Sequence, residues 1–220
     1  MIRRVMTYMA TLAAVALFAG CATKPPEVDY SAFRSAKPRS IVVLPPLNES
    51  ADIKATYAML SLATYPLAES GYYVLPVALV DETFRQNGLT VPGEIHTVPV
   101  PKLREIFGAD AALYVTVTDY GSRYQVLSSV TRVAAKAKLV DLRSGDVLWS
   151  GTAVTANDGG NTSGGGLIGM LISAAINQAV NHLTDAAYPI AGTTSYRLLS
   201  AGMPGGILYG PRSPKYDKVD

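Results

Sequence analysis

The sequence predicts a mixed α/β (α+β) fold, in which helices pack on a mixed sheet that contains an antiparallel three-strand meander. Two short apolar segments open the folded part at residues 40–46 and 72–76, and a helical pattern follows each of them. A clear period-two alternation then runs through residues 129–142, which is typical of a strand with one buried face. Together these patterns predict one sheet with helices packed on it.

The first strand and the first helix are bounded by proline and glycine. Residues 40–46 (SIVVLPP) predict a buried strand, which two prolines end because proline cannot donate to a sheet. Residues 52–62 have a helical pattern, and Pro66 is expected to kink the helix or to begin a new turn. Gly71 fits a C-terminal helix cap.

Proline and glycine also divide the next part of the chain. The predicted elements are a second short strand at 72–76, a helix at 77–86, an irregular stretch at 89–98, and a short helix at 102–107 that Pro101 starts and Gly108 ends.

The three strands of the meander are expected at residues 111–120, 129–142 and 147–155, with a turn at 143–146. Along the middle strand, small and branched apolar residues alternate with cationic ones, so one face is expected to be buried and the other wet. The apolar set is Val133, Ala135, Ala137 and Leu139, and the cationic set is Arg132, Lys136 and Lys138.

After the meander the sequence predicts a glycine-rich loop at 156–166 and a long amphipathic helix at 167–188. Residues 196–220 are rich in glycine and proline and are expected either to wrap the domain or to stay mobile. The expected organisation is a signal peptide at 1–20, a lipidated cysteine and proline-rich tether at 21–38, a globular domain at 39–195, and a C-terminal tail at 196–220.

The N-terminus has the three parts of a secretory signal: Arg3 and Arg4, an apolar run, and the small residues Ala19 and Gly20. Its apolar stretch is about 15 residues long, whereas a spanning helix needs about 20. The expected product is therefore cleaved and exported.

The segment LFAGC at residues 17–21 resembles the bacterial lipobox, although Phe18 is bulkier than the residue usual there. The resemblance implies that Cys21 is lipidated, which would hold the protein on a bilayer almost irreversibly. By resemblance to sorted lipoproteins, Ala22 in place of aspartate favours the outer membrane. The alternative is a free or buried cysteine behind an ordinary signal.

Composition excludes several classes of function. Without the two arginines of the signal, the chain has 17 basic and 17 acidic residues, whereas a nucleic-acid binder needs a basic stripe. One cysteine excludes an internal disulfide framework, and two histidines leave little material for a metal site, so no metal and no cofactor are expected.

No convincing catalytic pair is apparent. His96 is adjacent to Glu94 in a loop, but no GxSxG motif supplies a nucleophile, and His182 is flanked by Asn181. The glycines before residue 167 lack the lysine and hydroxyl residue of a phosphate-binding loop. An envelope hydrolase therefore remains a minor alternative.

A partner-binding surface is instead expected at the glycine loop, the apolar start of the following helix, and the tail. The candidate contact residues are Gly164, Gly165, Leu167, Ile168, Arg212 and Tyr216.

Residues 41–53 (IVVLPPLNESADI), 202–206 (GMPGG) and 210–214 (GPRSP) resemble a proteobacterial lipoprotein family of unknown function, which includes a meningococcal vaccine-candidate lipoprotein. The resemblance implies a domain similar to the N-terminal domain of the Tol–Pal translocation protein. It also implies genes beside a curli-secretion-type lipoprotein, which makes that protein a candidate partner, and a homodimer. It supplies no catalytic residues.

The expected function is that of a non-catalytic outer-membrane lipoprotein, acting as an adaptor or accessory subunit in a cell-envelope or secretion assembly. The alternatives are a subunit of a membrane pore and an envelope lipoprotein that binds glycan or peptidoglycan. The sequence leaves open whether the domain faces the periplasm or the cell surface.

Overall fold

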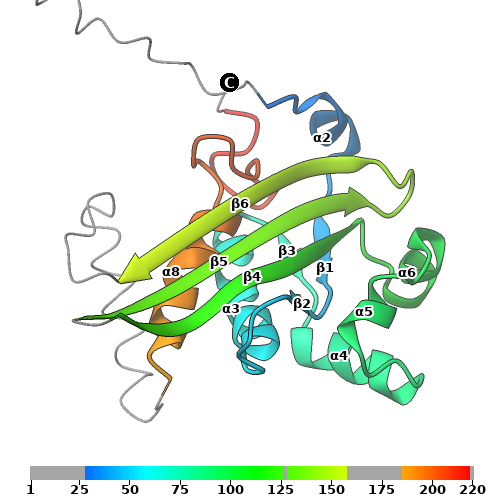
Figure 1. Ribbon diagram of the computed structural model, residues 1–220. Coiled ribbons are helices and arrows are strands. Elements are labelled where there is room, and N and C mark those ends of the chain that lie inside the picture. The colour runs from blue at the N-terminus through cyan, green and yellow to red at the C-terminus, as the bar shows by residue number, and fades with distance from the viewer. Residues whose placement is uncertain (1–27, 126–127, 158–184, 219–220) are drawn as a thin grey trace, which may run out of the picture.

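The computed structural model describes residues 28–125, 128–157 and 185–218, which form one sheet with helices on both faces (Figure 1). The strand order is β3-β1-β4-β5-β6, and β2 also pairs with β4. The strands are β1 (Ser40–Val43), β2 (Leu47–Asn48), β3 (Tyr73–Val74), β4 (Ala111–Gln125), β5 (Ser128–Asp141) and β6 (Val147–Asn157). β1 pairs in parallel with β3 and β4, whereas β4, β5 and β6 pair antiparallel. The expected mixed sheet with its three-strand meander is confirmed.

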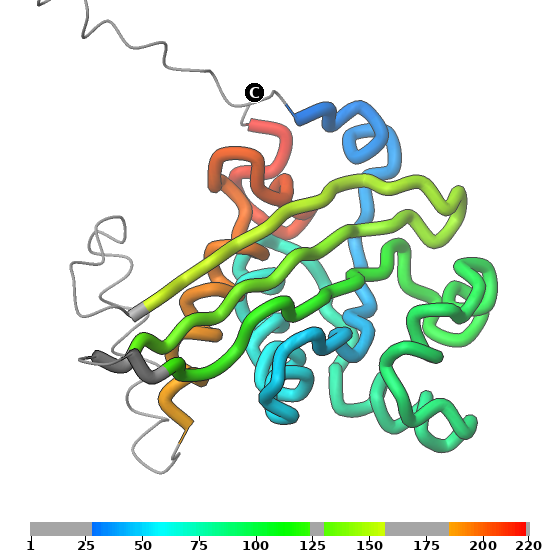
Figure 2. Tube along the Cα trace, in the orientation of Figure 1, coloured from blue at the N-terminus to red at the C-terminus, as the bar shows by residue number. Residues whose placement is uncertain are grey.

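The helices cover the two faces of the sheet unequally. They are α2 (Ser31–Ala36), α3 (Ala55–Glu69), α4 (Val77–Gln86), α5 (Pro92–Ile95), α6 (Val100–Phe107) and α8 (Ala187–Leu199). α3 and α8 pack together on one face, and α2 contacts β6 (Figures 1 and 2). α4, α5 and α6 lie on the other face, over β1 and the adjacent ends of β4 and β5. In the described part of the chain, the rest of that second face has no helix over it.

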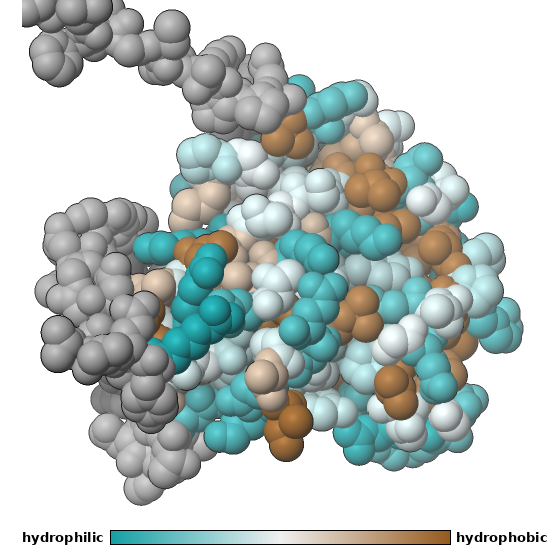
Figure 3. Space-filling view, viewed as in Figure 1, coloured by the Kyte–Doolittle hydropathy of each residue, from teal (hydrophilic) through white to brown (hydrophobic). Residues whose placement is uncertain are grey.

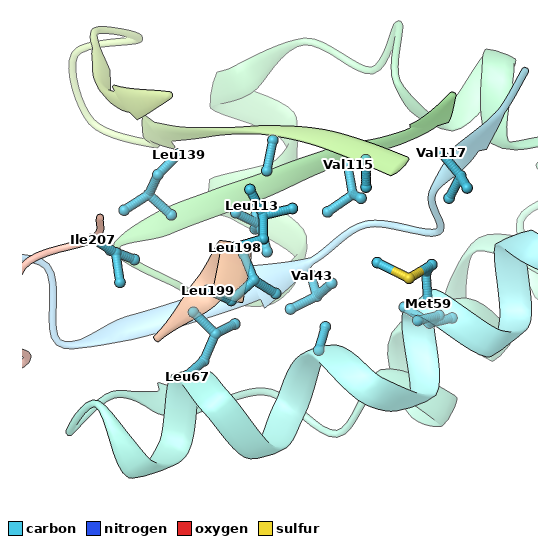
Figure 4. Packing of buried hydrophobic residues seen from close by; sticks show 14 of the residues in the cluster. Val43, Met59, Leu67, Leu113, Val115, Val117, Leu139, Leu198, Leu199 and Ile207 are labelled. Atoms are coloured by element: carbon cyan, nitrogen blue, oxygen red, sulfur yellow. The ribbon is translucent and has the colours of Figure 1, made fainter. Parts of the chain in front are cut away.

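The main core lies between the sheet and the α3/α8 layer (Figure 4). Its side chains come from alternate positions of the strands, from both helices and from the chain beyond α8. Those labelled in Figure 4 are Val43, Met59, Leu67, Leu113, Val115, Val117, Leu139, Leu198, Leu199 and Ile207. The strand β1 is buried on both sides, because Ile41 and Val43 face this core while Val42 faces the smaller core under α4 to α6.

The alternation expected along β5 is confirmed. Val133, Ala135 and Leu139 are buried in the main core, whereas Lys136 and Lys138 are exposed on the opposite face. A period of two places successive side chains on opposite faces of the sheet, so the cations on this strand point away from α3 and α8.

α3 continues through Pro66 to Glu69. Proline has no N–H, so the carbonyl of Leu62, one turn earlier, receives no hydrogen bond from that position of the helix. The Ser195 hydroxyl of α8 donates to this carbonyl at 3.0 Å. The proline therefore exposes an acceptor that a buried serine of the neighbouring helix satisfies. Gly71 follows the helix with a φ of 97°, which agrees with the expected cap.

Two stretches differ from expectation. Residues 31–36, expected within an extended tether, form α2, because Phe33 is 3% exposed and packs in the main core. The folded part therefore includes residues 28–38. Residues 92–95, expected to be irregular, form α5.

Most of the helix expected at 167–188, and the glycine loop before it, lie outside the described residues. α8 begins at Ala187 and continues to Leu199, so it crosses the expected boundary between residues 195 and 196. Its sequence includes Pro189, Gly192 and Thr194, which are weak helix formers, yet Ala191, Thr194 and Leu198 are buried against the domain. Burial therefore decides the conformation of this segment.

Residues 200–218, here called the C-terminal strap, wrap the domain rather than leaving it. Ile207 is 1% exposed in the main core, and the indole N–H of Trp149 donates to the carbonyl of Gly205 at 2.9 Å. The backbone of Gly210 donates to the carbonyl of Ser70 at 2.8 Å. The first part of the strap is therefore an integral part of the fold.

Gly71 and Gly210 let the strap approach the end of α3. A Cβ on Gly210 would lie 2.5 Å from the Gly71 carbonyl oxygen, and one on Gly71 would lie 2.7 Å from the Gly210 oxygen. These neighbours are backbone atoms, so neither can move aside cheaply. Only glycine at both positions permits this contact.

Candidate functional site

The expected lipidation residue and most of the expected partner-binding residues lie outside the described residues. Arg212 and Tyr216, in the C-terminal strap, are the two that the structure places. The others are Cys21, Gly164, Gly165, Leu167 and Ile168.

Arg212 and Tyr216 lie on the outer part of the strap. The guanidinium carbon of Arg212 lies 5.2 Å from the ring centroid of Tyr73, while its backbone N–H donates to the Gly71 carbonyl at 3.1 Å. Tyr216 is half-buried, and its backbone N–H donates to the Ser213 carbonyl at 3.0 Å. Arg212 is exposed and is therefore accessible to a partner.

The strap and α2 together line a hollow of about 1220 Å³, here called the strap hollow. The hydroxyls of Tyr30 and Tyr72 donate to the carbonyls of Gly206 and Leu208, both at 2.6 Å. Burial raises the pKa of both tyrosines, and the nearby Tyr216 raises that of Tyr72 further. Both rings therefore stay uncharged and hold the strap onto the domain.

A second hollow, of about 720 Å³, lies on the sheet face that α4 to α6 leave uncovered; it is here called the sheet hollow. Its lining includes His96 from the end of α5 and a set of polar side chains on β4, β5 and β6. That set is Tyr114, Thr116, Lys136, Lys138, Ser150 and Thr152.

His96 is fixed at the edge of the sheet hollow. Its Nε2 lies 2.9 Å from the carbonyl oxygen of Pro45, and because a carbonyl only accepts, Nε2 carries the proton. Its ring meets Tyr114 edge-on at 5.2 Å, and Lys138 Nζ lies 4.9 Å from the Tyr114 centroid. Burial lowers the pKa of His96, the Pro45 hydrogen bond opposes this, and Lys138 lowers it further. The imidazole is neutral at neutral pH, and its hydrogen bond to the Pro45 carbonyl fixes the ring in place.

Basic side chains dominate the uncovered face, here called the open face, of β4, β5 and β6. Lys136 pairs with Glu49 at 3.4 Å, and Arg132 and Arg123 share Asp119 at 3.7 and 3.2 Å. Lys138 has no acidic partner among the described residues. Figure 3 shows hydrophilic side chains gathered across these strands. Four basic and two acidic residues leave this face cationic.

The geometry offers little for catalysis. The expected neighbours His96 and Glu94 are not joined by a hydrogen bond between side chains, since His96 Nε2 contacts Pro45. His182 lies outside the described residues. Within the ranges that the structure covers, no three His, Cys, Asp or Glu side chains gather as a metal site would require.

Sequence reasoning missed both hollows. The strap hollow joins α2 to a segment more than 160 positions later, and no local pattern signals that pairing. The sheet hollow had a partial signal, since the alternation of lysines along β5 predicted a wet face. The alternation does not predict how far α4 to α6 extend over this face, and that extent decides how much of the face stays open.

The fold and the surfaces described above define a mixed α/β domain with one hollow on an open sheet face and another between α2 and the C-terminal strap. Residues 28–212 match the family described as "Putative lipoprotein GNA1162-like", and the chain belongs to that family. The resemblance inferred from residues 41–53 and the strap is thereby confirmed.

Two relatives come from Neisseria meningitidis. The chain is 52% identical to the "Putative lipoprotein NMB1124/NMB1162" of serogroup B over 202 residues, which are 91% of this chain and 94% of the relative. The crystal structure of lipoprotein GNA1162 is 55% identical, with a TM-score of 0.55, covering 66% of this chain and 99% of that one. A PelC dodecamer from Paraburkholderia phytofirmans is 13% identical with a TM-score of 0.45, over 73% of this chain and 84% of that one.

Membership of a lipoprotein family implies a membrane-anchored protein of the cell envelope. Of the helices in the described ranges, none has the length and apolar character needed to cross a bilayer.

Proposed function

We propose that the protein is a non-catalytic outer-membrane lipoprotein that acts as an adaptor in a cell-envelope or secretion assembly. Lipid on Cys21 anchors it, and Ala22 directs it to the outer membrane. Membership of a lipoprotein family and the signal-like N-terminus support the anchor. The absence of a nucleophile–base pair in the described ranges supports a role in contact rather than in chemistry.

The observation that carries the adaptor role is the open face. An antiparallel sheet commonly keeps one face in water, and α4 to α6 cover only one end of that face here, so the rest of it is accessible to a partner. The open face presents amines and hydroxyls around a hollow of about 720 Å³. Its cationic balance fits a partner with an acidic surface.

The partner is an envelope protein, and a curli-secretion-type lipoprotein is the first candidate because the family resemblance implies that its gene lies nearby. A second copy of this chain is the other candidate, since the same resemblance implies a homodimer. Electrostatic complementarity would set the rate and the specificity of docking more than its affinity.

In-cell crosslinking in the native host, followed by affinity purification and mass spectrometry, tests the proposal. The unaltered protein is compared with Cys21→Ala behind a cleavable signal, and with Lys136→Glu/Lys138→Glu on the open face. A matched control, Lys54→Glu/Lys102→Glu, reverses two exposed lysines away from that face.

An adaptor predicts one envelope protein that is recovered with the unaltered chain and with the matched control, and lost with both other variants. Loss with Cys21→Ala alone would place docking elsewhere than on the open face. Recovery of this chain only would favour the homodimer. Recovery of no crosslinked protein would contradict an adaptor and favour glycan binding.

A further inference from the structure

The N-terminal end of the described chain and the C-terminal strap lie at the same end of the domain (Figure 2). α2 and the strap face each other across the strap hollow. Seven Cα-to-Cα steps separate Cys21 from Val28, which span at most roughly 25 Å when fully extended. If Cys21 holds the lipid, as the proposed function states, this end of the domain lies near the bilayer.

The charges at this end suit an anionic surface. Residues 28–37 and 200–218 carry two acidic and five basic residues, and all five basic residues are exposed. None of the five forms a salt bridge within the described chain, whereas seven of the other eleven described lysines and arginines do. The five are Arg34, Lys37, Arg212, Lys215 and Lys218.

Side chains suited to the membrane–water interface lie among these cations. Met203 is 36% exposed, Pro204 is exposed, and Tyr209 and Tyr216 are half-buried beside the hollow. Lys215 Nζ lies 5.4 Å from the Tyr209 ring centroid. Tyrosine with a polar tip and an apolar ring is favoured at the level of lipid headgroups, where cations also meet anionic phosphates.

We propose that the end formed by α2 and the C-terminal strap docks on anionic phospholipid headgroups. The inference rests on the proposed function, because it needs the anchor at Cys21. Screening confines the attraction between these cations and the headgroups to about 8 Å at physiological salt. The short link from Cys21 keeps the cations near the bilayer, within reach of this attraction. Attachment makes docking intramolecular, so modest attraction suffices to orient the domain.

The single cysteine allows a direct test. The chain from Cys21 onward, which holds every described residue, is coupled through its thiol to maleimide lipid. The vesicles are phosphatidylcholine with or without phosphatidylglycerol. Lysines are then modified with an amine-reactive ester, and the rate at each lysine is measured by peptide mass spectrometry.

Docking predicts that Lys37, Lys215 and Lys218 react at least about threefold more slowly on the anionic vesicles than on the neutral ones. Lys54 and Lys138 should react equally on both. In Lys37→Glu/Arg212→Glu/Lys215→Glu, protection of the remaining reporter Lys218 should disappear. The matched reversal Lys54→Glu/Lys102→Glu/Arg104→Glu should keep it.

Equal rates at the strap lysines on both vesicles would overturn the inference, as would protection of Lys136 and Lys138 instead. The coupling is chemical, so its outcome does not depend on acylation in the cell. An intact mass of the native protein without added lipid would contradict the proposed anchor, whatever the vesicles show.

Discussion

The hydrogen bond from Ser195 to the Leu62 carbonyl predicts how much the free energy of unfolding falls when the hydroxyl is removed. Ser195 is 1% exposed, and its hydroxyl lies 3.0 Å from an acceptor that Pro66 deprives of its usual helical donor. Ser195→Ala therefore leaves a carbonyl without a partner beside the core. A hydrogen bond contributes a net 0.5–1.5 kcal/mol and an unsatisfied buried group costs about 1–3 kcal/mol, so we expect a loss of about 1–2 kcal/mol.

The same reasoning predicts that this loss depends on the proline. In Pro66→Ala the new backbone N–H can donate to the Leu62 carbonyl, so adding Ser195→Ala should then cost less than about 0.5 kcal/mol. The difference is a coupling free energy of about 1 kcal/mol, within the range seen for residues that share a partner. Urea unfolding followed by circular dichroism measures all four proteins of the cycle.

Ser61→Ala is the matched control, because Ser61 is an exposed serine of α3 whose hydroxyl donates to Ala58 in its own helix. Its effect should stay within about 0.5 kcal/mol. An equal loss from Ser195→Ala in the unaltered chain and in the Pro66→Ala variant would refute the reasoning, since the hydroxyl would then not be replacing the missing donor.

Three further predictions concern the strap and the histidine. Ile207→Ala should lower the free energy of unfolding by about 2–4 kcal/mol in urea, whereas Ile53→Ala, at an 88% exposed isoleucine, should change it by less than about 0.5 kcal/mol. Gly210→Ala should cost about 1–3 kcal/mol and alter Trp149 fluorescence, while Gly93→Ala, with open space around its Cβ, should do neither. The pKa of His96 is lower in the folded than in the unfolded chain, so the neutral imidazole contributes fully to the free energy of unfolding above pH 6.5, and this contribution is lost as pH falls through the folded pKa. The free energy of unfolding of His96→Gln, measured in urea, should therefore decline less from pH 7 to 5 than that of the unaltered protein.

The meander could be predicted because its signal is local. Alternate residues of β5 differ sharply in polarity, and a short turn joins it to β6, so neighbouring positions in the sequence carry the pattern. The helices α4 and α6 were predictable for a similar reason, since Pro76 precedes α4, Pro101 lies in the first turn of α6, and Asn87 or Gly108 follows their last residues. α6 begins at Val100, just before the predicted start at Pro101.

α2, α8 and the strap could not be predicted because distant contacts decide them. Tyr30 provides no side-chain cap for α2, and although the Asp29 carboxylate accepts the Ser31 N–H at 2.8 Å, a helix of six residues also needs the burial of Phe33 against the core. α8 carries proline and glycine, and it is stable because α3 and the sheet cover it. The strap hollow needs both chain ends, so its position follows only from the assembled fold.

The joining of the two chain ends has a consequence for biosynthesis. Tyr30 and Gly206 are 176 positions apart and share a hydrogen bond, and Phe33 and Ile207 lie in the same core. At about 5–20 residues per second, roughly 10 to 35 seconds pass between the synthesis of these two ends, and the core stays incomplete throughout. The complete core therefore cannot form until the C-terminal strap has been synthesised.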